Sequence, residues 1–218
     1  IDKLHQNGIG AIIDFVPVHF AVDKFGLKRY DGTALYEYPG KRGRSEWGSF
    51  NFNHGRGEVR SFLRSAANFW LKELHFDGIR MDAVSRLIFW NGDYNQGENH
   101  DGIEFLKNFN EGIRKLHPKA ILIAEDSTIY PGMTTPVEYG GMGFDYKWDL
   151  GWVYDTFHYL SKSIKERETI QDKISFSFHY GRNERYIMEL SHDEVGRGRK
   201  SIIEKLHGTY EEKFAQLR

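Results

Sequence analysis

Residues 76–83 read FDGIRMDA, and this stretch decides the fold. Its apolar side chains predict a buried strand, and Asp82 stands where that strand ends. A carboxylate at the end of a buried strand costs solvation energy unless it has partners or a function. Arg80 lies two residues before Asp82, so both side chains should point to the same side of the strand.

Two more acidic residues end apolar runs in the same way. Glu125 closes ILIAE (121–125), and Asp193 follows the apolar part of YIMELSHDE (186–194). One such carboxylate is usually structural. Three of them, each at the carboxyl end of an expected strand, predict a single catalytic rim on a parallel barrel.

The order of the expected elements supports a parallel sheet. Apolar runs that read as strands alternate with segments that carry an apolar stripe at helical spacing, and this alternation favours parallel strands joined by crossover helices. No glycine-rich phosphate-binding motif follows any strand, which weakens a nucleotide-binding reading. Asp101 and Glu104 resemble a capping box at the start of the second long helix. The expected strands cover 10–16, 76–83, 120–125, 144–149 and 186–191; the helices cover 1–7, 58–74, 101–116, 151–163, 169–180 and 208–218; and long loops cover 17–57 and 126–143.

Composition narrows the class of protein. The chain has 218 residues, enough for one sizeable domain, and its net charge of −1 gives no sign of nucleic acid or an anionic membrane as a partner. It has no cysteine, which excludes disulfides and thiolate metal sites, and no apolar run of about 20 residues that could span a bilayer. No signal peptide is visible, and we expect a cytoplasmic protein. Because the chain begins with Ile1, we expect it to be an excerpt of a longer protein.

The acidic residues suit the cleavage of a bond between sugars. That reaction needs a general acid for the leaving oxygen and a nucleophile or base on the other face of the sugar ring. Two carboxylates on neighbouring strands could meet this need. Basic and imidazole groups nearby would keep one of them ionised, and the sequence supplies Arg80, His19 and His192 at strand ends.

At this point the chain resembles the catalytic barrel of the α-amylase family, glycoside hydrolase family 13. The four short motifs of that family occur in order, each at an expected strand end. They are DFVPVH (14–19), GIRMDAV (78–84), IAED (123–126) and LSHDE (190–194). The resemblance implies an α/β fold, a partial TIM (β/α)8 barrel holding about strands three to seven. It also implies that residues 1–218 are one piece of a catalytic domain, without the flanking N-terminal carbohydrate-binding and C-terminal β-domains.

Within that family the chain is most similar to the glucan-branching enzymes. The similarity is carried by DGTALYEY (31–38), by EDSTIYPGMTTPVEYGGMGFDYKWDLGWVYDT (125–156) and by RGRKS (197–201). It implies that an α-1,4 glucan is cleaved and that the chain is transferred to a 6-hydroxyl by retaining double displacement.

The resemblance also implies a role for each motif residue. Asp82 would be the nucleophile, Glu125 the general acid/base and Asp193 the transition-state stabiliser. His19, Arg80 and His192 would bind substrate or the nucleophile, and Asp14 would brace the site.

The expected partners are α-glucans such as glycogen, amylose and amylopectin, and the full-length protein should be a monomer or a small oligomer. Loop aromatics are candidates for holding the glucan: Trp47, Trp90, Trp148 and Trp152. No cofactor is expected. Ser85 and Arg86 stand where many amylases have Lys-His, which argues against an amylase-type calcium site there.

Two alternative functions stay open. One is an α-glucan hydrolase with the same chemistry, and the other is a non-catalytic barrel relative that only binds. The intact set of three acids argues against the second, and the 139–156 stretch argues against the first. Because an incomplete barrel would expose sheet edges, we expect residues 1–218 alone to be inactive and prone to aggregate.

Overall fold

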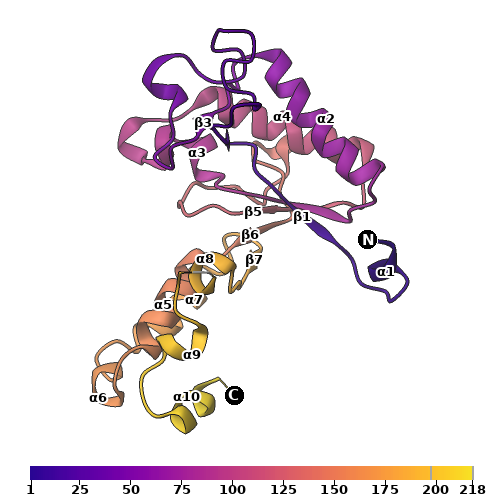
Figure 1. The fold of residues 1–218 in the computed structure, drawn as a ribbon. Coiled ribbons are helices and arrows are strands. Elements are labelled where there is room, and N and C mark those ends of the chain that lie inside the picture. Colours follow the sequence, from indigo (N-terminus) through magenta and orange to yellow (C-terminus); the bar gives the residue numbers. More distant parts are fainter. Residues whose placement is uncertain (197, 218) are drawn as a thin grey trace. The chain divides into compact units, whose positions relative to one another are not determined.

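The computed structural model describes residues 1–196 and 198–217. Arg197, the first residue of the RGRKS stretch, and Arg218, the last residue of the expected 208–218 helix, lie outside the described residues. The chain divides into two compact units, residues 1–147 and residues 148–218 (Figure 1). Each unit is described by itself.

The first unit is built on a parallel sheet, as the alternation of elements predicts. Its strands are hydrogen-bonded in the order β1-β4-β5-β6, and adjacent strands are parallel. Their bounds are β1 (Ile12–Phe15), β4 (Gly78–Met81), β5 (Ile121–Ala124) and β6 (Tyr146–Trp148). The register places Asp14 opposite Arg80, and Arg80 opposite Ile123. Parallel strands end at the same edge of the sheet, so the motif residues after β4 and β5 meet at that edge.

Two long helices make the crossovers and cover one face of this sheet (Figure 1). They are α2 (Gly57–Lys72) and α4 (His100–Leu116). Each buries residues at helical spacing: Val59, Leu63, Ala67 and Leu71 in α2, and Phe105, Leu106, Phe109 and Ile113 in α4. These side chains form one core with apolar residues of the strands, and the rings of Phe15 and Phe109 stack at 5.8 Å. The predicted apolar stripes are therefore confirmed at these positions, whereas Phe62 and Leu116, which helical spacing also places on the stripes, are exposed.

The predicted capping box of α4 is wrong. The N-cap is Asn99, whose side-chain oxygen accepts a hydrogen bond from Gly102 N–H at 3.2 Å. Asp101 lies inside the first turn, and Glu104 instead pairs with Arg60 of α2 at 2.9 Å. The N-cap thus lies two residues before the predicted one, and asparagine caps a helix as well as aspartate does.

The loop 17–57 contains more structure than its composition indicates. It holds an antiparallel pair of short strands, β2 (His19–Phe20) and β3 (Phe50–Asn51), in which His19 lies opposite Asn51. The other short elements of the first unit include one inside this loop, η1. They are α1 (Asp2–His5), η1 (Gly40–Gly43), α3 (Ser85–Ile88), η2 (Trp90–Gly92), η3 (Tyr94–Gln96) and η4 (Val137–Tyr139).

The second unit is mainly helical, and α5 packs against α7. Its helices are α5 (Leu150–Leu160), α6 (Ile164–Arg167), α7 (Asp172–Tyr180), α8 (His192–Val195), α9 (Ile202–Lys205) and α10 (Tyr210–Gln216). The strand expected at 186–191 is shorter than predicted, because β7 covers only Tyr186–Ile187. Met188 and Leu190 are exposed, whereas Glu189 between them is buried.

Glu189 is held in an unusual environment within the second unit. Its Oε2 accepts a hydrogen bond from Asp149 N–H at 3.0 Å, and its buried Oε1 has no hydrogen-bond partner among the described residues. The pKa of the Glu189 carboxyl is raised to about 7, chiefly by burial and also by the Asp149 and Glu194 carboxylates, while two backbone hydrogen bonds oppose the shift. Glu189 is therefore a buried acid that takes up its proton near neutral pH.

Replacing Phe109 with alanine should destabilise the protein strongly. The ring is completely buried at the contact between α4 and the sheet, so the variant loses the transfer free energy of the ring and gains a cavity. We expect a loss of about 3–5 kcal/mol in the free energy of unfolding, measured by denaturant titration of the intact protein. The control is Phe69→Ala, which removes a half-exposed ring from α2 and should cost about 1 kcal/mol or less. Equal losses in the two variants would contradict the assignment of the core.

Glu189→Gln should stabilise the protein at alkaline pH. The folded-state pKa of about 7 lies above the ordinary value of 4.5, so on raising the pH the unfolded chain loses its proton first. The stability associated with this group is complete below pH 4.5 and falls as the pH rises through 7. We therefore expect the melting temperature of the glutamine variant to exceed that of the wild type at pH 8.5, and the gap to close toward pH 4.5. Glu168→Gln, at an exposed position, should show no such pH-dependent gap.

Candidate active site

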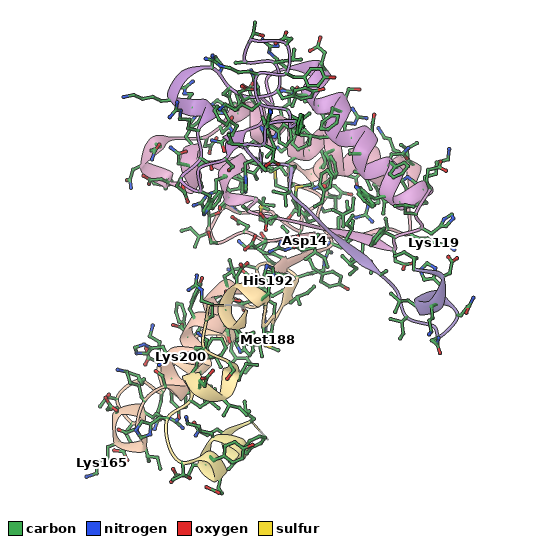
Figure 2. All side chains as sticks on the ribbon, in the orientation of Figure 1. Asp14, Lys119, Lys165, Met188, His192 and Lys200 are labelled. Carbon is green, nitrogen blue, oxygen red and sulfur yellow. The ribbon has the colours of Figure 1, made fainter. Side chains whose placement is uncertain are left out.

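Asp14, Arg80, Asp82 and Glu125 come together at the carboxyl ends of neighbouring strands. Asp14 lies on β1 (Figure 2), Arg80 lies on β4, Asp82 directly follows β4, and Glu125 directly follows β5. The parallel register places Asp14 beside Arg80. The strand ends therefore deliver three acids and one cation to one place, as their positions in the sequence predict.

The Arg80 guanidinium is the centre of this cluster. Its Nη1 donates to Asp14 Oδ1 at 2.5 Å and to Asp82 Oδ1 at 2.6 Å, and its Nη2 lies 3.0 Å from Glu125 Oε2. The Arg80 side chain is only 6% exposed. Burial works against the charged form of Arg80, but the carboxylates of Glu125, Asp14 and Asp82 outweigh it and raise the pKa of the guanidinium. One buried cation thus binds three carboxyl groups.

The Glu125 side chain is fixed by a second donor from the backbone. Ala83 N–H donates to Glu125 Oε2 at 2.7 Å, and Val84 N–H donates to the Glu125 carbonyl at 2.9 Å. Ala83 has a φ of 49°, a left-handed conformation that is uncommon for a residue with a side chain. Such conformations gather at functional sites, where the surrounding structure compensates for their cost. The turn after Asp82 therefore aims a backbone donor at the next carboxyl group.

Glu125 favours its neutral form more than an ordinary glutamate does. Burial raises the pKa of the Glu125 carboxyl. The neighbouring Asp82 raises it further, through its negative charge and a side-chain hydrogen bond, whereas Ala83 N–H and Arg80 oppose the shift. A carboxyl whose pKa is raised, next to a second carboxyl, is the pattern expected of a general acid beside a nucleophile.

His19 lies on β2 in the same unit, close enough to the cluster for Asp82 to influence its titration. Its Nδ1 hydrogen-bonds Ser49 Oγ at 2.8 Å, and its ring lies 4.8 Å from the Trp47 ring. Burial lowers the pKa of His19. The Asp82 carboxylate opposes this shift, and the Arg86 guanidinium adds to it. A neutral imidazole with one fixed nitrogen can offer its other nitrogen to a ligand.

The ring of Trp47 is half-exposed and lies under the Arg86 guanidinium at 4.7 Å. Arg86 also forms an ion pair with Glu46. Arg86 is thus held by an acid and by an aromatic ring of the 17–57 loop.

His192 and Asp193 belong to the second unit, where Figure 2 labels His192. They lie in the first turn of α8, whose N-cap Ser191 accepts a hydrogen bond from Asp193 N–H at 3.1 Å. His192 Nε2 lies 3.5 Å from Asp193 Oδ1, and both side chains are exposed. The expectation that Asp193 leaves the end of a strand is corrected here: β7 ends at Ile187, and Asp193 lies on a helical turn.

Two buried charged residues near Glu125 were not among the site residues predicted from the sequence. Asp126 follows Glu125 directly, and its carboxylate pairs with Lys147 of β6 at 2.8 Å. Both residues stand in stretches that carry the family resemblance. A lysine in the middle of an apolar strand is the signal that could have identified the pair, because lysine is almost never fully buried without a partner.

Among the residues that the structure describes, no group of three or more histidine, cysteine, aspartate or glutamate side chains could hold a metal ion. In that same part of the chain, no helix has both the length and the apolar character needed to cross a membrane.

Comparison with curated proteins shows close relatives along the whole chain. The chain is 46% identical to the 1,4-alpha-glucan branching enzyme of Bacillus caldolyticus and 45% identical to that of Geobacillus stearothermophilus. It is also 45% identical to the enzyme of Fusobacterium nucleatum. Each match covers 100% of this chain but only 33%, 34% and 36% of the respective relatives. The chain thus spans about a third of the length of the curated relatives it matches.

Comparison with solved structures identifies the fold. An alpha-amylase from Lactobacillus plantarum superposes with a TM-score of 0.65 at 17% identity, over 95% of this chain and 47% of the amylase. An alpha-amylase from Geobacillus thermoleovorans superposes with a TM-score of 0.61 at 19% identity, over 85% of this chain and 39% of the amylase. The parallel strands and crossover helices are therefore part of a TIM barrel of the alpha-amylase type.

No protein-family model matches the chain. The identity to the curated relatives extends over every motif on which the resemblance rests. Over its whole length the chain is thus homologous to a segment, about a third in length, of the 1,4-alpha-glucan branching enzymes.

Proposed function

We propose that the protein containing this chain is a 1,4-alpha-glucan branching enzyme, and that residues 1–218 supply part of its catalytic (β/α)8 barrel. The observation that carries the proposal is the cluster in which one buried arginine binds Asp82 and Glu125 together. Retaining enzymes that act on sugar bonds use two carboxyl groups, one as nucleophile and one as acid and then base. The names of the relatives support a glucan as the substrate.

In the first half-reaction the Asp82 carboxylate attacks the anomeric carbon of an α-1,4 linkage. Glu125 gives its proton to the departing glycosidic oxygen, and the donor chain becomes an ester on Asp82. This step needs Glu125 protonated and Asp82 ionised. The raised pKa of Glu125 and the pairing of Asp82 with Arg80 support that division of roles.

In the second half-reaction Glu125, now ionised, takes the proton of an acceptor 6-hydroxyl. The acceptor oxygen displaces Asp82 from the anomeric carbon and an α-1,6 branch forms, so the bond broken and the bond made are both α. Asp193 would stabilise the positive charge that develops at the anomeric carbon, and His19 and His192 would bind sugar hydroxyls. Asp14 would brace Arg80, which it contacts at 2.5 Å.

The proposal extends to the setting of the enzyme. Flanking carbohydrate-binding and β-domains would account for part of the length by which the relatives exceed this chain. A branching reaction on a glucan store would belong to glycogen synthesis, and we propose that the protein acts in the cytoplasm as a monomer or small oligomer. The loop aromatics remain candidates for holding the glucan, and the half-exposed Trp47 is the one that lies beside His19.

The branching activity can be tested with the intact protein and amylose. We expect iodine colour to fall and α-1,6 linkages to appear by ¹H NMR while the number of reducing ends stays nearly constant. Asp82→Ala should lower the rate by about 10⁴-fold or more, as loss of a nucleophile does, while the folded state persists. The control is Glu111→Ala, an exposed acid on α4. Reducing ends that rise without α-1,6 linkages would point to a hydrolase, and an inert wild type would point to a binding protein.

The electrostatic coupling at the site gives a further prediction. Because the Asp82 charge helps to raise the pKa of Glu125, Asp82→Asn should lower that pKa toward the ordinary glutamate value. The measurement is a ¹³C NMR titration of the intact protein labelled at its glutamate carboxyls. Glu111→Gln, remote from the cluster, should leave the Glu125 resonance unchanged. An unchanged or higher Glu125 pKa in the Asp82→Asn variant would refute the coupling.

A further inference from the structure

The second buried cation of the first unit, Lys147, lies next to the segment that carries Glu125. Its ammonium group donates to Asp126 Oδ2 at 2.8 Å and to the Thr128 carbonyl at 2.6 Å. The Lys147 side chain is 6% exposed, and that of Asp126 is 0% exposed. The pair is therefore removed from solvent as completely as the core around it.

The Asp126 carboxylate uses both of its oxygens to hold the chain that leaves β5. Oδ1 accepts from Thr128 N–H at 3.1 Å, and Oδ2 accepts from Thr128 Oγ1 at 3.0 Å in addition to Lys147. Lys147 and Asp126 together therefore close a compact turn over residues 126–128. That turn begins at the residue after Glu125, so its position sets the direction in which the chain leaves the strand.

The register of the sheet places this pair on the face opposite the Arg80 cluster. Lys147 of β6 is paired with Ala124 of β5, and Arg80 of β4 is paired with Ile123 of β5. Side chains alternate between faces along a strand, so Glu125 shares a face with Arg80 whereas Asp126 shares a face with Ala124 and Lys147. Ala124 belongs to the apolar core under the helices. Glu125 and Asp126 are thus bound in opposite directions, each by a buried cation on a neighbouring strand.

Stability is a poor explanation for such a pair. Burying two charges costs several kcal/mol of solvation for each ion, and well-packed apolar residues are often as good or better. A buried ion pair instead imposes one geometry, because any displacement leaves an unpaired charge in the core. A shift of about 1 Å in a reacting group can cost about a hundredfold in rate.

We propose that Lys147 and Asp126 are positioning residues for Glu125: they fix the backbone after β5 so that the Glu125 carboxyl meets Ala83 N–H, Arg80 and the leaving oxygen of the substrate. The proposal rests on the proposed function. It assigns to the FDYKWD stretch (144–149) a task in proton transfer.

The test uses two donors that differ in their need for an acid. Amylose has a sugar oxygen as leaving group and needs protonation, whereas an α-maltooligosyl fluoride releases fluoride and needs little. In the intact protein, Lys147→Met should lower kcat on amylose by about a hundredfold with KM changed by less than about threefold. It should leave the rate of the first fluoride release, measured as a pre-steady-state burst, within about threefold, because only that step bypasses Glu125. Rates are expressed per folded molecule, with the folded fraction taken from thermal unfolding.

A double variant guards against misfolding. Lys147→Met alone leaves Asp126 as an uncompensated buried charge, whereas Lys147→Met with Asp126→Asn removes both charges. If the single variant does not fold, the double variant is read in its place, with the same expected selectivity for amylose.

The matched control lies at the other end of the same two strands. Arg114 pairs with Asp145 at 2.9 Å, and Asp145 accepts a hydrogen bond from Leu122 N–H of β5 at 2.8 Å. Arg114→Met should lower the melting temperature, but any change in rate should be the same on amylose as on the fluoride. Equal losses on amylose and fluoride in the Lys147 variants, or no loss on amylose, would overturn the positioning role.

Glu125→Gln separates failure of this inference from failure of the proposed function. If Glu125 is the acid, this variant loses activity on amylose and retains the pre-steady-state burst of fluoride release, because only the later transfer step needs Glu125 as a base. If Glu125→Gln shows that selectivity and the Lys147 variants do not, only the positioning role is wrong. If Glu125→Gln lacks it, the acid role on which both proposals depend is wrong.

Discussion

The structure depends on one buried guanidinium that holds three carboxyl groups at the rim of a parallel sheet. Arg80 contacts Asp14 and Asp82 at 2.5 and 2.6 Å and Glu125 at 3.0 Å. A single positive charge cannot compensate three negative ones, so one member of the set is driven toward its neutral form. That member is Glu125, which is buried and also feels the charge of Asp82. Burial and this imbalance of charge, which the sheet register imposes, thus both favour the neutral form of Glu125.

The sequence predicted the parts of the fold that depend on periodicity. The apolar stripes of α2 and α4 and the runs of β1, β4 and β5 are each decided by spacing within a segment, and the structure confirms them. The sequence did not predict the features that depend on which groups meet in space. Asn99 rather than Asp101 caps α4, β7 stops at Ile187, and β2 pairs with β3 inside a loop. The β2–β3 pairing depends on a partner strand elsewhere in the chain, whereas the cap of α4 is a local choice between neighbouring residues that helical spacing does not settle.

The same distinction applies to the candidate site. Strand ends and the alternation of side chains suffice to place Arg80, Asp82 and Glu125 together, because parallel strands end at one edge. They do not reveal that Ala83 takes a left-handed conformation to aim its N–H at Glu125, or that Lys147 is buried against Asp126. The strain and the buried pair are both unfavourable locally, so no local propensity predicts them. Where local rules fail in a well-packed fold, function is the usual reason.

The two buried cations, Arg80 and Lys147, fix the orientation of the residues at the end of β5. Consecutive carboxyl groups, Glu125 and Asp126, leave the strand on opposite faces, and each meets a cation from a neighbouring strand. Exchange of the two partners would need a one-residue slip of β5, which would turn Leu122 and Ala124 out of the core. The same register of β5 therefore satisfies both the packing of its apolar side chains and its two ion pairs. In the proposed mechanism Glu125 gives up and regains a proton during each turnover, and such a frame would keep its position independent of its own charge.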